Sequence, residues 1–312
     1  DIVMTTEVNH HIGLEGIFNF KLTNSKTGET RQFEFKNLIL NSGLERFAVD
    51  SNLLVGCILG SSGSTPVESN TAISNILGSS TTLQSFGAGS SNTTVLPYYT
   101  SRYWTYRFIE GKATGNISQV AMAYGTVNTT TNAYSGLFSL ALVKDSNGTP
   151  ITITKLADEV LDVTYTLRIY VPELDVTGVM YISGVAYNYT VRAAQAAAWN
   201  AGYPFNNVYY ASAYTGAIGS LTSSPSGSSS GNSSSTMSSY VAGSFTRDIT
   251  LFWDLNAGNI GGIRSVYLSL AMGGTNAVLF QVGYSNAIDG TAIPKDATKR
   301  LTLKYRFTWG RV

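Results

Sequence analysis

Apolar and polar residues alternate along much of this chain with a period of two. Between Val160 and Val171 apolar residues take every second position, and polar residues such as Asp162 and Arg168 lie between them. Leu301–Trp309 alternates in the same way. This pattern predicts half-buried β-strands, because successive side chains of a strand point to opposite faces. Further strand candidates are Gly16–Thr23, Arg31–Leu40, Arg102–Glu110, Ile117–Tyr124, Leu137–Val143, Gly178–Val191, Ser244–Trp253, Arg264–Met272 and Val278–Tyr284.

Turn signals separate many of these segments, and helical signals are scarce. Ser25–Gly28 and Asp145–Gly148 have the composition of hairpin connections, since Gly and Asn accept positive φ. Arg192–Asn200 has the composition of a two-turn helix, and Asn41–Asp50 that of a short helix capped by Ser42. Many strands and few helices predict an all-β protein: an antiparallel β-sandwich or barrel-like domain with long irregular loops and little helix.

The same pattern predicts three parts along the chain. Residues 1–50 are expected to form an N-terminal hairpin or arm and a short helix. Residues 51–101 read as an irregular connection rich in Gly, Ser and Thr, and residues 102–312 as the main β-sandwich body. Residues 193–243 interrupt that body as an insertion, and so long a loop in a compact domain is normally functional or part of an interface.

Charged residues are absent from three long segments. No Asp, Glu, Lys or Arg occurs from Ser69 through Ser101, from Ala113 through Val143 or from Ala193 through Thr246. Soluble monomers usually carry charge over their whole surface, so these neutral segments favour a chain whose surface is covered by copies of itself, or one that works outside a cell. A free Ser/Gly run such as 219–239 would be mobile, so we expect a neighbouring subunit to hold it.

The overall composition narrows the classes of partner. The chain has 312 residues, of which 43% are hydrophobic and only 12% charged, and its net charge is +1. This balance lacks the basic surface that nucleic acids or anionic membranes attract, so neither nucleic-acid binding nor membrane insertion is expected. Its one cysteine, Cys57, lies in an apolar run and is expected to be a buried small hydrophobe.

Catalytic chemistry has few candidates. The two histidines, His10 and His11, are adjacent, and we expect them to be solvated or used at a contact. Asp158, Glu159 and Asp162 form a carboxylate cluster, which is typical of a solvent-facing strand with local ion pairs. The sequence therefore predicts a protein that is not an enzyme, with no catalytic or metal-binding residues and no cofactor.

Aromatic residues gather in two places. Candidate contact residues are Tyr98, Tyr99, Tyr103 and Trp104 in the first cluster, and Tyr209, Tyr210 and Tyr214 in the second. Aromatic side chains anchor protein interfaces, stack on sugars and fill cores, so three roles remain open for both clusters: subunit interface, glycan contact or core.

Three segments in order resemble virion proteins of tailed bacteriophages. They are Lys36–Leu44 (KNLILNSGL), Val55–Ile73 (VGCILGSSGSTPVESNTAI) and Gly136–Pro172 (GLFSLALVKDSNGTPITITKLADEVLDVTYTLRIYVP), and the resemblance covers roughly residues 36–75 and 100–192. It implies a non-enzymatic structural protein of the virion, assembled in the host cytoplasm: a tail, neck or collar, or fibre-anchoring component. Such proteins form symmetric rings or trimers and contact other virion proteins, and some contribute to host attachment through a surface glycan or protein.

Two other functions remain open. A secreted glycan-binding adhesin domain could use the same two aromatic clusters. An outer-membrane β-barrel would explain the aromatic alternation of Leu301–Trp309 and the 19 tyrosines, which could form interfacial girdles.

Overall fold

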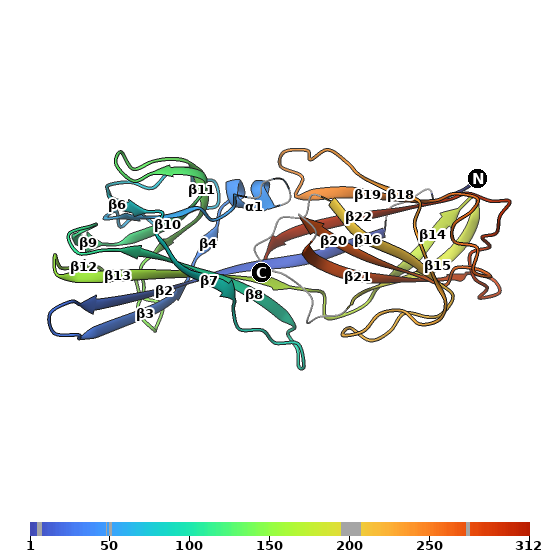
Figure 1. Ribbon diagram of the computed structural model, residues 1–312, viewed down its shortest axis with the longest axis horizontal. Helices are drawn as coiled ribbons and strands as arrows, with labels where there is room; N and C mark the ends of the chain where they lie inside the picture. The colour runs from blue at the N-terminus through green and yellow to red at the C-terminus, as the bar shows by residue number, and fades with distance from the viewer. Residues whose placement is uncertain (5–7, 48, 50–51, 195–206, 273–274) are drawn as a thin grey trace. The chain divides into compact units, whose positions relative to one another are not determined.

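The computed structural model describes all residues except 5–7, 48, 50–51, 195–206 and 273–274 (Figure 1). Strands make up 56% of the chain and helix 2%, and the strands form several antiparallel sheets. The predicted all-β class, with sandwich or barrel-like sheets and little helix, is confirmed.

The chain forms two compact units, each assembled from segments that are distant in the sequence. Unit 1 contains Asp1–Gly13, Ser91–Thr100 and Ile169–Gly310. Unit 2 contains Leu14–Ser90, Ser101–Arg168 and Arg311–Val312. The units have a boundary between Thr100 and Ser101 but none near residue 50, so they do not follow the three expected parts. Strand β2 (Val8–Asn24) illustrates why: with 17 residues it is long enough to supply both units.

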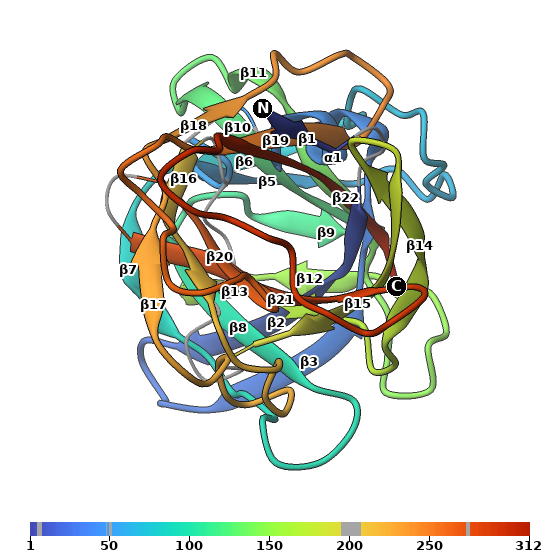
Figure 2. The same ribbon diagram turned by 90° about the vertical axis from the view of Figure 1, so that its right-hand side faces the viewer.

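Unit 1 consists of two sheets whose inner faces are apolar. The first has the strand order β18 (Ser234–Met237), β19 (Thr246–Trp253), β22 (Leu301–Arg311) and the first part of β2, with β1 (Ile2–Val3) parallel to β22. The second, seen in Figures 1 and 2, has the order β14 (Val176–Ile182), β15 (Val185–Ala193), β21 (Thr275–Asn286), β20 (Ser265–Met272), β16 (Asn207–Tyr214) and β17 (Ser229–Gly231).

Large aromatic side chains from both sheets of unit 1 meet in its core. The Tyr284 and Tyr305 hydroxyls are 2.5 Å apart, and the Phe280 and Tyr305 ring centroids are 6.1 Å apart. Both tyrosines are buried, and their mutual hydrogen bond satisfies the two hydroxyls that the core would otherwise leave unpaired.

Unit 2 also contains two main sheets, one with longer strands and one with shorter strands. The first has the order β3 (Thr30–Lys36), the remainder of β2, β13 (Glu159–Tyr170), β8 (Tyr99–Phe108) and β7 (Leu83–Ala88). The second has the order β4 (Leu38–Ile39), β11 (Ala133–Leu142), β10 (Gln119–Asn128), β5 (Gly56–Gly60) and β6 (Ile76–Ser80), and β9 (Gly115–Ile117) pairs with β12 (Ile153–Lys155). The segment 51–101 thus contributes three complete strands.

An aromatic cluster fills the core of unit 2. The Tyr165 ring contacts Phe18 and Phe138 edge-on, at centroid distances of 4.9 and 6.3 Å. Its hydroxyl accepts a hydrogen bond from Asn37 Nδ2 at 2.9 Å. Cys57 lies fully buried in strand β5, as its apolar surroundings predicted.

The segment Gly178–Val191, predicted as one strand, is a hairpin. Strands β14 and β15 are joined by a two-residue turn of Ser183 and Gly184, whose φ angles are 47° and 82°. Positive φ at both positions matches the right-handed twist of paired strands, so this Ser-Gly pair forms a tight hairpin turn. The two turns predicted at Ser25–Gly28 and Asp145–Gly148 are confirmed, with Gly28 and Gly148 at positive φ.

One of the two predicted helices is confirmed. Helix α1 covers Asn41–Phe47, but Ser42 does not cap it: its hydroxyl donates to the Leu137 carbonyl at 2.6 Å. The second prediction, Arg192–Asn200, is wrong at its start, because Arg192 and Ala193 end strand β15. Pairing of Arg192 with Gln281 of β21 outweighs the local helix propensity. Residues 195–200 lie outside the described part of the chain.

Candidate binding surfaces

Two of the predicted contact residues lie on one face of strand β16 in unit 1. Tyr210 and Tyr214 point away from the core, whereas Ala211 and Ala213 between them are buried against it. The Tyr210 side chain is 45% exposed and Tyr214 is half-buried. Tyr209 belongs to the same strand, but its side chain lies outside the described part of the structure.

A third tyrosine completes this group. Tyr267 of β20 lies opposite Ser212, and its ring centroid is 5.9 Å from that of Tyr210, edge to face. Burial, with smaller contributions from Tyr214 and Tyr210, raises the pKa of Tyr267 to about 12. Burial likewise raises the pKa of Tyr214. These three residues, Tyr210, Tyr214 and Tyr267, form one tyrosine surface, and burial favours the neutral hydroxyl of Tyr214 and of Tyr267.

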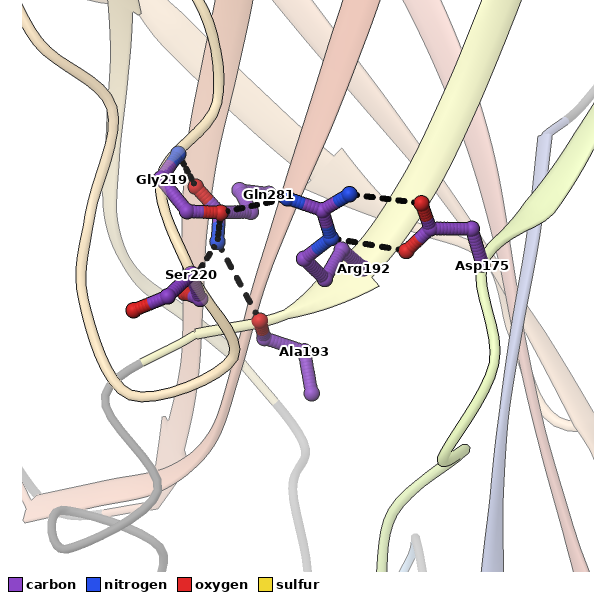
Figure 3. A network of polar contacts seen from close by, with 6 residues as sticks. All are labelled: Asp175, Arg192, Ala193, Gly219, Ser220 and Gln281. Atoms are coloured by element: carbon purple, nitrogen blue, oxygen red, sulfur yellow. Dashed lines mark hydrogen bonds and ion pairs between the residues drawn. The ribbon is translucent and has the colours of Figure 1, made fainter.

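Gln281 and Arg192 continue this face along the sheet (Figure 3). Gln281 is fully buried, and its Oε1 accepts the Gly219 amide at 2.8 Å. Its Nε2 approaches the carbonyls of Ala193, Gly219 and Ser220 at 3.2, 3.0 and 2.9 Å. The loop at Gly219 and Ser220 is not paired with a strand, and the Gln281 side chain supplies the hydrogen-bond partners that a neighbouring strand would provide.

Arg192 links the same loop to Asp175, the residue just before strand β14. Its Nη1 donates to the Gly219 carbonyl at 2.7 Å, while Nε and Nη2 form a bidentate pair with the Asp175 carboxylate at 2.7 and 2.6 Å (Figure 3). The pair lowers the pKa of Asp175 through its hydrogen bonds to the guanidinium. A charged residue just outside the neutral segment therefore anchors the start of the Ser/Gly run.

Contacts within the chain therefore hold residues 219–239, and the structure does not need the expected neighbouring subunit to hold them. Besides Gln281 and Arg192, strands β17 and β18 pair with β16 and β19. The Trp253 indole and the Gly258 amide also donate to Ser230. The sequence did not reveal these partners, because period-two alternation identifies the face of a strand but not the loop that covers it.

A small hollow lies beside this loop. It measures about 230 Å³, and its lining includes the polar residues Asn188, Thr190, Ser285 and Arg264 and the apolar residues Ala217 and Ile218. The Arg264 guanidinium donates to the Gly290 carbonyl at 3.2 Å. Amide, hydroxyl and guanidinium groups of this kind suit a neutral polar ligand, such as a saccharide hydroxyl.

The first aromatic cluster divides between the units. Tyr98 and Tyr99 belong to unit 1, where Tyr99 lies 5.3 Å from Tyr170 between ring centroids. Tyr103 and Trp104 belong to β8 in unit 2, and all four side chains are half-buried. Half-burial leaves both a contact role and a packing role open.

The histidine prediction is wrong for His10. This side chain is 1% exposed in unit 1, and burial lowers its pKa to about 3. The alternation of β2 turns His10 inward and leaves its neighbour His11 exposed, with Nδ1 2.7 Å from the Thr308 hydroxyl. A pair of adjacent histidines therefore has one member in the core, as period two requires.

The carboxylate cluster forms ion pairs with separate partners. Asp162 makes a bidentate pair with Arg107 at 2.8 and 2.9 Å, and Glu159 accepts from Arg31 at 3.0 Å. Asp158 lies 3.8 Å from Lys26. The expected ion pairing along this part of unit 2 is confirmed, although Asp162 pairs across strands and not with Arg168, which lies 3.6 Å from Glu15.

In the part of the chain that is described, no group of three or more His, Cys, Asp or Glu side chains is arranged to hold a metal ion. No helix among the described residues has the length and apolar character needed to cross a membrane.

Comparison with known proteins adds no relative. No protein-family model, no curated protein and no solved structure matches this chain.

Proposed function

We propose that this chain is a non-enzymatic structural protein of a tailed-bacteriophage virion, a tail, collar or fibre-anchoring component that assembles with copies of itself. The observation that carries the proposal is a set of exposed apolar side chains inside the charge-free segments. Leu83, Phe86, Val95, Leu96 and Val241 all lie in charge-free segments, with exposed fractions from 42% for Leu83 to 67% for Val241.

Such surfaces are unfavourable on a solitary soluble protein. Apolar side chains without nearby charge promote association, and proteins that stay monomeric usually intersperse both signs of charge among them. In a symmetric assembly the same surfaces are buried against neighbouring copies. The resemblance of residues 36–75 and 100–192 to virion proteins supports the same class of function.

The decisive experiment is to find the chain in the particle. Phage particles purified on a density gradient should contain it at a fixed copy number by quantitative mass spectrometry. Antibody-gold labelling should mark one defined substructure of the tail or neck. Particles that lack the chain, from a host that expresses it, would overturn the proposal.

A glycan-binding adhesin domain is the second candidate, favoured by the exposed Tyr210 and by the 230 Å³ hollow in the same unit. A glycan array tests it with the wild type and Tyr210→Ala. Tyr181→Ala is the matched control, because Tyr181 is also a strand tyrosine of this unit and is 50% exposed. Binding that is lost only in Tyr210→Ala would support this candidate, and an array without binding would remove it.

A further inference from the structure

The two edges of the longer-stranded sheet in unit 2 differ in chemistry. Edge strand β3 carries Arg31, Glu34 and Lys36 along its seven residues. Edge strand β7, Leu83–Ala88, has the sequence LQSFGA and lies within a charge-free segment. Natural sheets protect their edges with charged side chains, proline or a covering loop, so β3 is protected in the usual way and β7 is not.

The side chains of β7 are exposed as well as neutral. Phe86 is 59% exposed and Leu83 is 42% exposed. Every residue of the strand is exposed except Gly87, which is half-buried. An exposed phenylalanine in the middle of a neutral edge strand is unfavourable in water and favourable in a contact.

Strand β8 supports β7 through two predicted contact residues. Phe86 is the register partner of Trp104, and Gly87 that of Tyr103. A Cβ at Gly87 would lie 3.6 to 3.8 Å from the Tyr103 ring and hydroxyl, so this ring packs over the glycine. Residues Ser85–Ala88 pair without irregularity, and the one register shift lies before them, between Leu83 and Ser85. The result is a regular edge held by aromatic neighbours.

The open edge also leaves backbone groups to be paired. Alternate residues of an edge strand direct their N–H and C=O groups away from the sheet, where they act as a template for another strand. In unit 1 the edge strand β14 is different, because Met4 forms a bridge with Ile182 at its end. β7 therefore combines exposure, neutrality and regular pairing, and unlike the neutral edge strands β17 and β18 it carries an exposed phenylalanine.

We infer that β7 pairs antiparallel with β7 of a second copy of this chain, across a two-fold axis, so that the two sheets become one. A strand that meets itself must carry no excess of one charge, because a two-fold axis places like residues near each other. β7, which has no charged residue, meets this condition, whereas β3 carries two cations and one carboxylate. The inference rests on the proposed assembly of copies and names the strand that joins them.

The first test is the dissociation constant of the full-length chain, measured by analytical ultracentrifugation. Phe86→Lys should weaken the dimer about 30-fold or more, the loss expected for a central aromatic anchor. Gln32→Lys adds the same charge to the other edge strand and should leave the dissociation constant unchanged. Equal far-ultraviolet circular dichroism spectra of both variants and the wild type show that neither has unfolded.

The second test is cross-linking. Single cysteines at Gln84, Ser85 and Phe86 sample the positions near the axis, and the native Cys57 does not compete because it is fully buried. At least one of the three should give a disulfide-linked dimer under mild oxidation, while Gln32→Cys should not.

The outcomes separate this inference from the proposed function. If the wild type associates but Phe86→Lys associates equally well and no β7 cysteine cross-links, the β7 pairing is wrong while assembly stands. If the chain is monomeric alone and β7 cysteines cross-link only to another virion protein, the second copy is the wrong partner. Detection of the chain in purified particles decides the function independently of either result.

Discussion

The His10 and Phe280 rings stack face to face in the core of unit 1, with centroids 4.5 Å apart and planes inclined by 14°. Phe307 lies 5.8 Å from His10 on a second side. Neither ring nitrogen has a hydrogen-bond partner among the described residues. This histidine is thus held as a neutral aromatic ring, and protonating it would place an uncompensated charge between two phenylalanines.

Stability should therefore fall on mild acidification. The pKa of His10 is about 3 in the folded state and 6.5 in a solvated chain, so below pH 6.5 the unfolded state binds a proton that the folded state does not bind. The free energy of unfolding is therefore highest above pH 6.5 and falls progressively toward pH 3. By pH 5 the loss should reach about 2 kcal/mol relative to pH 8. Urea unfolding followed by tryptophan fluorescence measures it.

Replacement of the ring isolates this effect. His10→Phe keeps the stack and removes the titration, so its stability should depend less on pH between 8 and 5. Partial loss of solvent around the ring also lowers the pKa of His11, so His11→Gln should lose a smaller part of the dependence. Parallel pH profiles for the wild type and His10→Phe would show that His10 does not control acid stability.

Gln281→Ala should release the loop that it holds. The substitution removes one acceptor and two donors, leaving the Gly219 amide and the Ser220 carbonyl to water. Hydrogen–deuterium exchange of residues 217–224 should rise at least tenfold while exchange in β20 stays slow. The control Gln32→Ala removes an exposed glutamine and should leave this loop unchanged. Unaltered protection in Gln281→Ala would mean that other contacts suffice.

Gly43→Ala should destabilise unit 2. A Cβ on Gly43 would come within 2.2 Å of the Phe138 carbonyl oxygen, a backbone atom that cannot rotate away, so helix α1 must shift. The expected cost is about 1–3 kcal/mol in the free energy of unfolding. Gly63→Ala is the matched control, because nothing lies within 4 Å of its added methyl group. Equal melting temperatures for the two variants would contradict the close approach.

Cys57 should be unreactive until unit 2 unfolds. Burial raises the pKa of its thiol, so the nucleophilic thiolate is scarce as well as inaccessible. Ellman's reagent should label less than a tenth of the protein in native buffer within an hour and one thiol per chain in 6 M guanidinium chloride. Rapid labelling of the native chain would indicate that β5 opens on that timescale.

The alternation of apolar and polar residues correctly predicted which side chains of a strand face the core. Strands β13 and β22 alternate between buried and half-buried residues along almost their whole length, because each lies over a core on one side. The same rule applied to β2 would have placed His10 in the core. An adjacent pair of histidines near the N-terminus instead suggested two exposed side chains, because the phenylalanines that pack against His10, Phe280 and Phe307, are distant in the sequence.

Features that depend on strand pairing could not be predicted. The register of β16, β20 and β21 is what places Tyr267 beside Tyr210 and Tyr214, and Gln281 under its loop. Periodicity assigns a face to each strand but says nothing about its neighbours. The interleaved units escaped prediction for the same reason.

The pairing of Ile2 with Leu301 has a consequence for biosynthesis. The partners are separated by nearly the whole sequence, so a ribosome must translate residues 301–311 before unit 1 can close. Until then β1 and the first part of β2 lack β22, the strand that pairs with them in the folded protein. Slow closure of this kind favours a folding chaperone, or rapid capture of the finished chain, over folding during translation.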